Sequence, residues 1–485
     1  MDIKPLYYGS EVDVVLKKAG ELEIGELSVE AIKGILSRSE LIQKALSILP
    51  VKERINCIRE IGFRWNEKLE NGRLQSLKHQ ISTGYSKRLI DLEFNLVSYM
   101  LSEDNVRRNL ESSFIKSVDG LQGFIETQKG EYYRYMPAGP VFIISSGNSL
   151  IPPLIPTTLS MVTGNLTILK PSLSNYLGVV EVYRILEEIA ESNDAAKKLL
   201  SSLMISCFTY DSDGLNYLLT KAPVGVINFW GAEPARSNVT KMVAENPNHP
   251  RLLVNGPLTG FAVIDAESVK EACGGLALNM ILYDQQLCSS PTQAVFIGKM
   301  EEAVVFAKKL GSLLDAVGKD FNVKTSASVF YILQSARRAL RFKGADVIAS
   351  SNPDNPWTVV LSKNKSTLEE VVKQIPEFNI YVRKRFIKII VVPDLEEVAG
   401  HIKNLSHRLA FKGVDKVQSV GLSLSVENRE KIVSRIAEAG VYRILNLQDM
   451  YMRSPLEPYD GVNIAAIFTY ILYYREVNYP FEVFK

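Results

Sequence analysis

Short apolar runs alternate with longer amphipathic stretches along the middle of the chain. Apolar residues recur at helical spacing in the longer stretches, such as 176–191 and 302–318, which predicts helices there. Strands that alternate with helices form βαβ units, so the pattern predicts an α/β fold with parallel sheets. The apolar runs expected to be strands are VFIISS (141–146), LTILK (166–170), VGVINFW (224–230), RLLVN (251–255), FAVID (261–265) and AVFIG (294–298).

Residues 1–115 have a different pattern. Leu, Glu, Lys and Arg recur at helical spacing with few strand signals, so we expect a mainly helical N-terminal portion. A chain of 485 residues is too long for one simple core. Changes in pattern place soft boundaries near residues 255 and 420. Parallel sheets bind ligands at the carboxyl ends of their strands, so functional residues are expected just after the apolar runs.

Composition and charge exclude several classes of protein. Apolar residues make up 46% and charged residues 23%, as in a soluble globular protein. A net charge of +2 predicts neither a nucleic-acid binder nor a polybasic membrane protein. Residues 138–169 carry no charge, but Gly and Pro interrupt them repeatedly, so we expect a buried strand-helix-strand unit there and no membrane span. The N-terminus lacks the pattern of a signal peptide, and we expect a cytoplasmic protein.

Cys288 lies in DQQLCSSPT, just before an apolar run. A lone cysteine there is a buried filler, half of a disulfide, a metal ligand or a nucleophile. The four cysteines are too sparse for a disulfide framework in a chain of this size. Neither the cysteines nor the four histidines show metal-ligand spacing, so no metal is expected. Buried filler and nucleophile both remain.

Three other positions follow apolar runs. Asn148 could donate its carboxamide to an oxyanion or could simply cap a helix. Lys170 could reach ribose hydroxyls or a phosphate, or could be an ordinary lysine at the end of a strand. Gly231 would let a diphosphate approach backbone at a helix start, although no GxGxxG motif is present. Taken singly, each position favours its purely structural interpretation.

The order of these positions resembles the aldehyde dehydrogenase superfamily. That family has an Asn after the first strand, a KPS-type strand end, a strand-Gly-helix turn, an ELGG segment and a GQxC nucleophile. The resemblance implies two Rossmann-like parallel-sheet domains and a small oligomerisation element. It further implies Cys288 as nucleophile with Asn148 at the oxyanion. The counterparts in this sequence are Asn148, KPS (170–172), FWGA (229–232), LVNG (253–256) and Gln286-Leu-Cys288.

One departure from the family pattern suggests the reaction. Leu253 stands where hydrolytic members carry the Glu that activates water, and a leucine cannot abstract a proton. A thiol such as CoA needs less help than water, so the acyl-CoA-reducing branch is favoured. The C-terminal segments 389–414, 440–450 and 457–476 look like the fatty acyl-CoA reductases of bioluminescence systems, including GVYRI and PYDG.

The resemblance implies a domain plan and a cofactor. We expect an NAD(P)-binding domain at 1–254, a catalytic domain at 255–420, and a segment at 421–485 that serves oligomerisation and returns to the cofactor domain. Leu173 replaces the Glu that repels a 2′-phosphate in NAD-specific members, which favours NADPH, with NADH as the alternative. The residues expected to bind the cofactor are Ser146, Lys170, Ser172, Trp230 and Gly231.

The expected reaction is NADPH-dependent reduction of a long-chain fatty acyl-CoA to the aldehyde through a Cys288 thioester. Expected partners are the acyl-CoA, an acyl-activating synthetase and further copies of the chain. Another acylating aldehyde dehydrogenase or an acyl-phosphate reductase is the alternative enzyme, and an inert scaffold of an acyl-transfer complex is the alternative outside enzymes. The basic run RKRFIK (383–388) is interpreted as a solvated strand face, with contact to CoA phosphates as the second choice.

Overall fold

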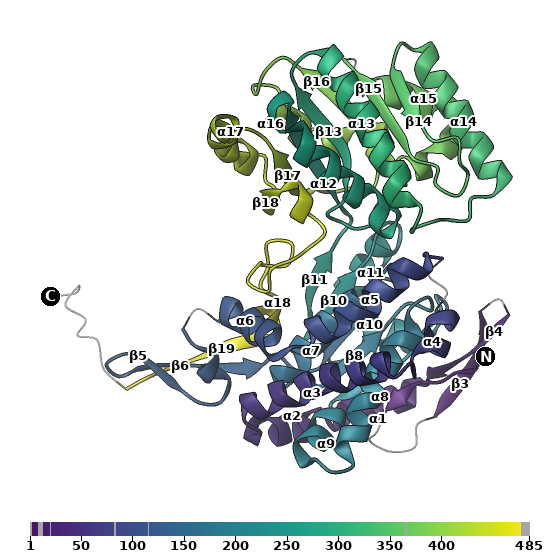
Figure 1. The fold of residues 1–485 in the computed structure, drawn as a ribbon. Helices are drawn as coiled ribbons and strands as arrows, with labels where there is room; N and C mark the ends of the chain where they lie inside the picture. Colours follow the sequence, from purple (N-terminus) through teal and green to yellow (C-terminus); the bar gives the residue numbers. More distant parts are fainter. Residues whose placement is uncertain are drawn as a thin grey trace. The chain divides into compact units, whose positions relative to one another are not determined.

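The computed structural model describes residues 2–7, 13–19, 21–81, 84–114, 116–363 and 366–476. The chain forms two compact units. The first unit comprises Met1–Thr83, Leu92–Asn255 and Ser454–Lys485, and the second comprises Gly84–Asp91 and Gly256–Arg453. Figure 1 shows both units as sheets covered by helices. The α/β class with parallel Rossmann-like sheets, predicted from the alternating pattern, is therefore confirmed.

The main sheet of the first unit has the order β11-β10-β7-β8-β9-β2 among the described residues. Its strands are parallel except β2, which runs antiparallel to β9. Four of the predicted apolar runs form neighbouring strands of this sheet, and both faces of β7 are buried, as expected of a parallel sheet covered on both sides. The strands are β2 (Leu6–Tyr7), β7 (Val141–Ile144), β8 (Thr167–Lys170), β9 (Leu203–Ile205), β10 (Val226–Trp230) and β11 (Arg251–Asn255).

The N-terminal portion is mainly helical from Val29 onwards, but it begins with strands that the sequence did not predict. A small sheet of order β1-β4-β3 precedes the helices, built from β1 (Asp2–Ile3), β3 (Val14–Ala19) and β4 (Leu22–Leu27). Leu, Glu and Lys are common in helices, so the residues of this sheet looked helical in the sequence. The antiparallel pairing of β3 with β4 makes them strands. The helices of the N-terminal portion are α1 (Val29–Ser37), α2 (Ser39–Ile48), α3 (Val51–Glu70), α4 (Gln75–Gln80), α5 (Lys87–Met100) and α6 (Glu103–Ser113). Between and after the strands of the main sheet lie α7 (Ile151–Val162), α8 (Tyr176–Ala190), α9 (Asp194–Leu200), α10 (Asp213–Thr220) and α11 (Ala235–Ala244).

The second unit contains a sheet of order β14-β15-β16-β13-β12-β17-β18, parallel except for β14. Alternate residues of its strands face opposite helical layers: Phe261 packs with α14–α17 and Ala262 with α12–α13. The strands are β12 (Leu258–Asp265), β13 (Pro291–Ile297), β14 (Asp346–Ala349), β15 (Thr358–Ser362), β16 (Phe386–Val392), β17 (Lys416–Ser423) and β18 (Arg443–Asn446). The helices are α12 (Val269–Ile281), α13 (Met300–Gly318), α14 (Ala327–Phe342), α15 (Thr367–Gln374), α16 (Val398–Lys403) and α17 (Val426–Glu438).

The C-terminal boundary differs from the expected one. The second unit continues to Arg453, and residue 420 lies inside β17, whose pairing with β12 and β18 keeps it in the sheet. From Ser454 the chain belongs to the first unit, where α18 (Ile464–Ile467) leads into β19 (Thr469–Arg475). There β19 completes a sheet of order β19-β6-β5 with β6 (Glu131–Pro137) and β5 (Ile125–Gln128), visible in Figure 1 as an extended arm.

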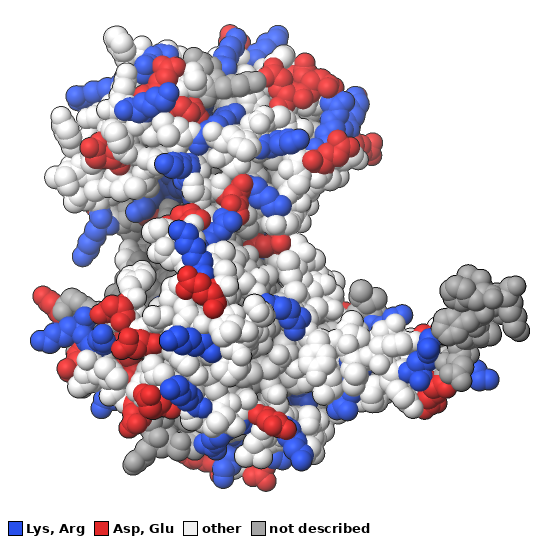
Figure 2. Space-filling view, turned by 180° about the vertical axis from the view of Figure 1, so that it is seen from behind, with Lys and Arg blue, Asp and Glu red and all other residues white. Residues whose placement is uncertain are grey.

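Two observations bear on the excluded classes. On the face shown in Figure 2, lysine and arginine side chains are interspersed with aspartate and glutamate, in line with the net charge of +2. Helix α7 begins within the uncharged stretch 138–169, where the buried carboxylate of Glu93 accepts the Leu150 N–H at 3.1 Å. No helix in the described part of the chain combines the length and hydropathy of a membrane span.

Candidate active site

The loop after β7 carries Ser146, Gly147 and Asn148. The Ser146 hydroxyl donates to Oδ1 of Asn148 at 2.9 Å, which sets the orientation of the carboxamide and makes Nδ2 its donor end. The carbonyl of Gly147 accepts from the Ser174 hydroxyl at 2.8 Å. A Cβ on Gly147 would lie 2.4 Å from the hydroxyls of both Ser172 and Ser174, so only glycine permits this approach. The loop containing Asn148 is thus packed against the segment that follows Lys170.

Lys170 ends β8, next to β7 in the sheet. Burial lowers the pKa of its ammonium, while Cys207 and Glu26 act in the opposite direction. The sequence showed no carboxylate near Lys170, but Glu26 of β4 lies within electrostatic reach of it. Glu26 is itself buried and accepts from the Thr209 N–H. This acidic neighbour comes from more than one hundred residues upstream, so no local motif indicated it.

The ends of β10 and β11 form a polar chain inside the first unit. The Trp230 indole donates to Asn228 at 2.6 Å, Asn228 donates to Asn255 at 2.8 Å, and Asn255 donates to Asp460 at 3.1 Å. The ring of Trp230 packs edge-on against Tyr459, with centroids 4.8 Å apart. The PYDG segment is therefore tied to the strand ends. This segment places Tyr459 against Trp230 and links Asp460 to Asn255, although these residues are far apart in the sequence.

Gly231 continues β10 beyond Trp230. Its N–H donates to the Asn255 carbonyl at 3.2 Å, so this donor is engaged within the protein. Helix α11 begins only at Ala235, with Pro234 at its N-cap. The strand, the glycine and the helix follow in the predicted order, with the glycine separated from the helix by three residues.

Cys288 is the exposed cysteine of the four, and none of the four forms a disulfide. Burial raises the pKa of Cys207 to about 12 and that of Cys273 to about 11, and burial together with nearby Glu53 and Glu60 raises that of Cys57 to about 11. These three thiols stay protonated near neutral pH, which makes them poor nucleophiles. The buried-filler interpretation therefore fits Cys57, Cys207 and Cys273, as predicted, and not Cys288.

Cys288 precedes β13, so it lies at the amino end of a strand and not at a carboxyl end. The backbone before it has an unusual conformation: Tyr283, Asp284 and Gln285 have φ values of 53°, 53° and 64°. Left-handed φ is costly for residues with side chains and persists only where the surroundings impose it. No residue type in this segment indicated the turn, because left-handed positions usually carry glycine or asparagine.

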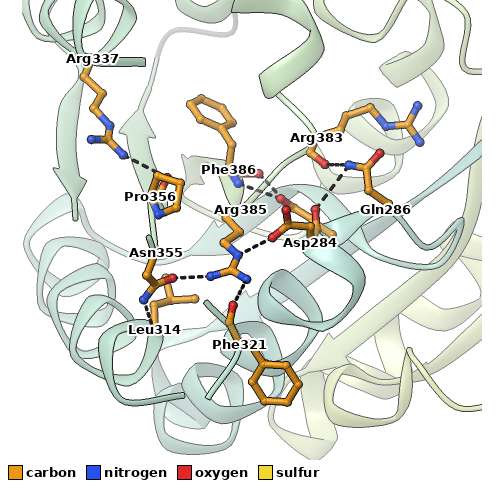
Figure 3. A network of polar contacts seen from close by, with 11 residues as sticks. Asp284, Gln286, Leu314, Phe321, Arg337, Asn355, Pro356, Arg383, Arg385 and Phe386 are labelled. Atoms are coloured by element: carbon orange, nitrogen blue, oxygen red, sulfur yellow. Dashed lines mark hydrogen bonds and ion pairs between the residues drawn. The ribbon is translucent and has the colours of Figure 1, made fainter. Parts of the chain in front are cut away.

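The basic run 383–388 imposes that conformation. Gln286 donates to the Arg383 carbonyl, and Asp284 accepts from Nε of Arg385 at 2.5 Å (Figure 3). Gln285 accepts the Phe386 N–H at 2.7 Å and donates to the Phe386 carbonyl at 2.8 Å. Each residue of the DQQ triplet therefore has a partner in this segment, which explains why polar residues precede the cysteine.

Arg385 is fully engaged in the interior. Besides Asp284, it donates to Oδ1 of Asn355 at 2.6 Å and to the Phe321 carbonyl (Figure 3). Arg385 is 2% exposed and Lys388 is 0% exposed. The interpretation of RKRFIK as a solvated strand face is therefore wrong. Two of its cations are buried. Arg385 holds the loop before Cys288, and Lys388 lies 3.8 Å from the Glu369 carboxylate.

In the described ranges, no group of three or more His, Cys, Asp or Glu residues could hold a metal ion. Asn148, Lys170 and Gly231 belong to the first unit, and Cys288 belongs to the second. Within the first unit the strand order places the ends of β8, β7 and β10 side by side. That edge carries all the residues expected to bind the cofactor.

Two mainly parallel sheets covered by helices, one in each unit, are the architecture of the aldehyde dehydrogenase fold. Methylmalonate-semialdehyde dehydrogenase (DddC) from Oceanimonas doudoroffii matches with a TM-score of 0.68 at 13% identity, covering 100% of both chains. Lactaldehyde dehydrogenase from Escherichia coli also matches with a TM-score of 0.68, covering 98% of this chain and 100% of that one at 13% identity. At such identities the likeness establishes the fold alone.

Residues 46–469 match the family Acyl-CoA reductase (LuxC), and the chain belongs to this family. The long-chain acyl-protein thioester reductase of Aliivibrio fischeri is 21% identical over 430 residues, covering 84% of this chain and 81% of that protein. The corresponding protein of Vibrio harveyi is 21% identical over 392 residues, covering 78% of each. The resemblance inferred from the sequence motifs is thereby confirmed.

Proposed function

We propose that this protein reduces a long-chain fatty acyl thioester to the aldehyde through an acyl-enzyme on Cys288, with acyl-CoA as the donor. The observation that carries the proposal is that Cys288 is exposed on a loop fixed by internal hydrogen bonds, whereas the other three thiols are buried. Family membership and the printed names of the relatives, long-chain acyl-protein thioester reductases, support the substrate class.

In the first step the Cys288 thiolate attacks the thioester carbonyl. A bond forms between the Cys288 sulfur and the acyl carbon, the bond to the CoA sulfur breaks, and CoA leaves as a thiolate. The Asn148 carboxamide and the Cys288 N–H are proposed to stabilise the oxyanion that develops on the carbonyl. The bond from Ser146 supports the role of Asn148, because it turns the amide so that its donor end can serve an oxyanion.

A nicotinamide dinucleotide, when bound, would supply the hydride to the acyl carbon. The bond from that carbon to the Cys288 sulfur then breaks, which releases the aldehyde and returns Cys288 as a thiolate. We propose that Ser146, Lys170, Ser172, Trp230 and Gly231 hold it at the edge formed by β8, β7 and β10. The residues present fit such a group: a cation stands at the end of a strand, and no carboxylate of the described residues makes an ion pair with it. The Gly231 N–H is committed to Asn255, so its proposed contribution is the close approach that a missing side chain permits.

NADPH is the proposed form of the cofactor. Leu173 is 39% exposed just beyond the strand and offers no charge against a 2′-phosphate, and Lys170 offers a positive one. Glu26 opposes this preference, since its carboxylate is negative and lies near Lys170. The balance between Glu26 and Lys170 therefore determines how strongly NADPH is preferred to NADH.

Release of the acyl group to water would waste the thioester. The resemblance to the ELGG segment puts Leu253 where hydrolytic enzymes carry a general base. Leu253 lies half-buried in β11, and its side chain cannot take a proton. The absence of a base at this position supports reduction over hydrolysis.

The experiment that tests the proposed function measures NADPH consumption by the full chain with acyl-CoA donors of increasing length, and identifies the aldehyde by mass spectrometry. We expect one aldehyde per NADPH with long chains and none with Cys288→Ala. Aldehyde formed from an acylated synthetase or acyl carrier protein but not from acyl-CoA would overturn CoA as donor while retaining thioester reduction. An acyl phosphate accepted in place of every thioester would favour the alternative enzyme.

Self-association is a further part of the proposal. Tyr470, Ile471, Leu472, Tyr473 and Tyr474 of β19 are all exposed on the three-stranded arm. A row of exposed apolar residues of this kind marks an interaction surface. We propose that the arm joins copies of the chain, and light scattering of the purified protein should give a mass that is a multiple of 54.2 kDa. A monomer at micromolar concentration would contradict this.

A further inference from the structure

A chain of three side chains on β17 and β18 ends at the Cys288 sulfur. Nε2 of Gln418 lies 3.2 Å from Sγ of Cys288. The Ser419 hydroxyl donates to Oε1 of Gln418 at 3.0 Å, and Nη1 of Arg443 donates to the Ser419 hydroxyl at 3.2 Å. Gln418 and Ser419 are completely buried, so water does not compete for the hydrogen bond between them.

This chain determines which end of the Gln418 amide faces the sulfur. Oε1 accepts from Ser419, so the N–H₂ group is the end directed at Cys288. An N–H donor stabilises a thiolate more than a thiol, because the negative sulfur is the stronger acceptor. Arg443, in turn, is held by the carbonyls of Met450 and Met452, which fixes the start of the chain.

A cation on the neighbouring segment lies within electrostatic range of the same sulfur. Arg383 donates to the Leu258 carbonyl at 3.1 Å, and its own carbonyl accepts from Gln286 of the nucleophile loop. In Figure 3 its guanidinium points away from the Asp284–Arg385 pair. Burial lowers the pKa of Arg383, whereas the negative sulfur of Cys288 acts in the opposite direction. Such an interaction is reciprocal, so the guanidinium favours the thiolate to the same extent.

The other charges on the surrounding elements are already engaged. Asp284 is paired with Arg385 at 2.5 Å. Lys416 of β17 donates to the Gly440 carbonyl at 2.9 Å and lies over the Tyr442 ring. The exposed Lys384 lies over the Tyr381 ring. Arg443 is committed to the hydrogen-bond chain described above. Arg383 is therefore the charge whose removal should alter Cys288 most.

We propose that Arg383 and Gln418 hold Cys288 as a thiolate near neutral pH, with Ser419 and Arg443 as positioning residues for the Gln418 amide. This inference rests on the proposed role of Cys288 as nucleophile and supplies the activation that the sequence left open, where no histidine partner was visible. Arg443 belongs to the GVYRI motif, so the inference also gives that motif a physical role.

The test measures the rate of Cys288 alkylation by iodoacetamide as a function of pH in the full chain, with peptide mass spectrometry to identify the modified thiol. The wild-type midpoint is expected below the ordinary thiol value of about 8.5. Arg383→Met should raise the midpoint by about one unit, which means about tenfold less thiolate at neutral pH. Gln418→Leu and Arg443→Met should raise it by a smaller amount, and Arg383→Lys should restore most of the Arg383→Met loss.

Lys384→Met is the matched control, since it removes the neighbouring cation without touching Cys288, and its midpoint should equal that of the wild type. Unmodified Cys57, Cys207 and Cys273 show that each variant is folded. If the buried cysteines of Arg383→Met are alkylated, that variant is not folded, and the midpoint of Gln418→Leu then tests the proposal. Equal midpoints in the wild type and the folded variants would overturn the proposal, as would a wild-type midpoint at the ordinary value.

The same samples, mixed with palmitoyl-CoA without a reductant, separate the two claims. Shifted midpoints together with no acyl adduct on wild-type Cys288 would retain the thiolate and refute the proposed acyl transfer. An adduct on wild-type Cys288 with unshifted midpoints would retain the acyl transfer and refute the roles of Arg383 and Gln418.

Discussion

The loop after β7 and the loop before β13 carry the two proposed catalytic side chains, but they are held in different ways. In the first loop the partners are nearer in the sequence. Ser146 donates to Asn148 two residues away, and Asn175 donates to the carbonyls of Ser146 and Ser149, 29 and 26 residues before it, at 2.9 and 2.7 Å. The backbone follows an ordinary path from strand to helix, with Gly147 where close packing requires it.

The second loop depends on partners about one hundred residues away. Asp284 is held by Arg385, Gln285 by Phe386, and Cys288 itself by Gln418. Three left-handed residues precede the cysteine, so this loop stores strain that its distant partners must offset. The difference teaches that the proposed oxyanion donor is held mostly by residues near it in the sequence, whereas the proposed nucleophile depends on residues of β16, β17 and the segment before β16.

Removing Arg385 should break the second loop with the largest effect. Arg385→Met leaves Asp284 without its buried cation and Asn355 without a donor, which costs about 3 kcal/mol of unfolding free energy. We also expect faster hydrogen exchange in residues 283–288. Urea denaturation and exchange mass spectrometry measure the two effects. Lys384→Met, at an exposed neighbouring position, should change stability by less than about 0.5 kcal/mol. An equal loss of unfolding free energy in Arg385→Met and Lys384→Met would mean that residues 383–388 act through their total positive charge and not through the contacts of Arg385.

A smaller effect should appear in the pH dependence of stability. Burial lowers the pKa of Lys388 to about 8, with Arg408 adding to the shift and Glu369 and Glu370 opposing it. Between about pH 8 and the unfolded value near 10.4, the unfolded chain binds more protons, so stability should rise with pH in that window. The contribution of Lys388 cannot exceed about 1.4 kcal/mol per pH unit.

Lys388→Met removes this contribution, so the variant should show a flatter rise in unfolding free energy than the wild type between pH 8 and 10. Denaturant titrations at three pH values give the difference, in which the contributions of the other titrating groups cancel. Parallel slopes would show that Lys388 does not lose its proton in the folded protein.

The smallest effect concerns the first unit. Glu26→Gln removes the negative charge near Lys170, so the ratio of NADPH to NADH affinity should rise by about threefold to tenfold. Dissociation constants for each cofactor, from quenching of protein fluorescence, provide the measurement. Glu23→Gln on the same strand, where the side chain is exposed, should leave the ratio unchanged. If Glu26→Gln behaves like Glu23→Gln, the 2′-phosphate does not bind near Lys170.

Much of this arrangement was predictable from residue pattern. The apolar runs gave six strands in their correct places, and Asn148, Lys170 and Cys288 followed from short motifs in a fixed order. What could not be predicted depends on contacts between distant segments. Nothing local indicates that Arg385 is buried, that Glu26 reaches Lys170, or that Gln418 faces Cys288. A charged residue is expected to be solvated unless a buried partner offsets its charge, and such a partner cannot be identified from the local sequence.

The central claim is that Cys288 forms the acyl-enzyme, and intact-protein mass spectrometry tests it most directly. The purified chain is mixed with palmitoyl-CoA without a reductant, and the mass is followed as CoA is released. One palmitoyl group should appear per chain, map to the peptide containing Cys288, and disappear as palmitaldehyde when NADPH is added. No adduct on the wild type, or an equal adduct on Cys288→Ala, would contradict the account and leave a scaffold as the better interpretation.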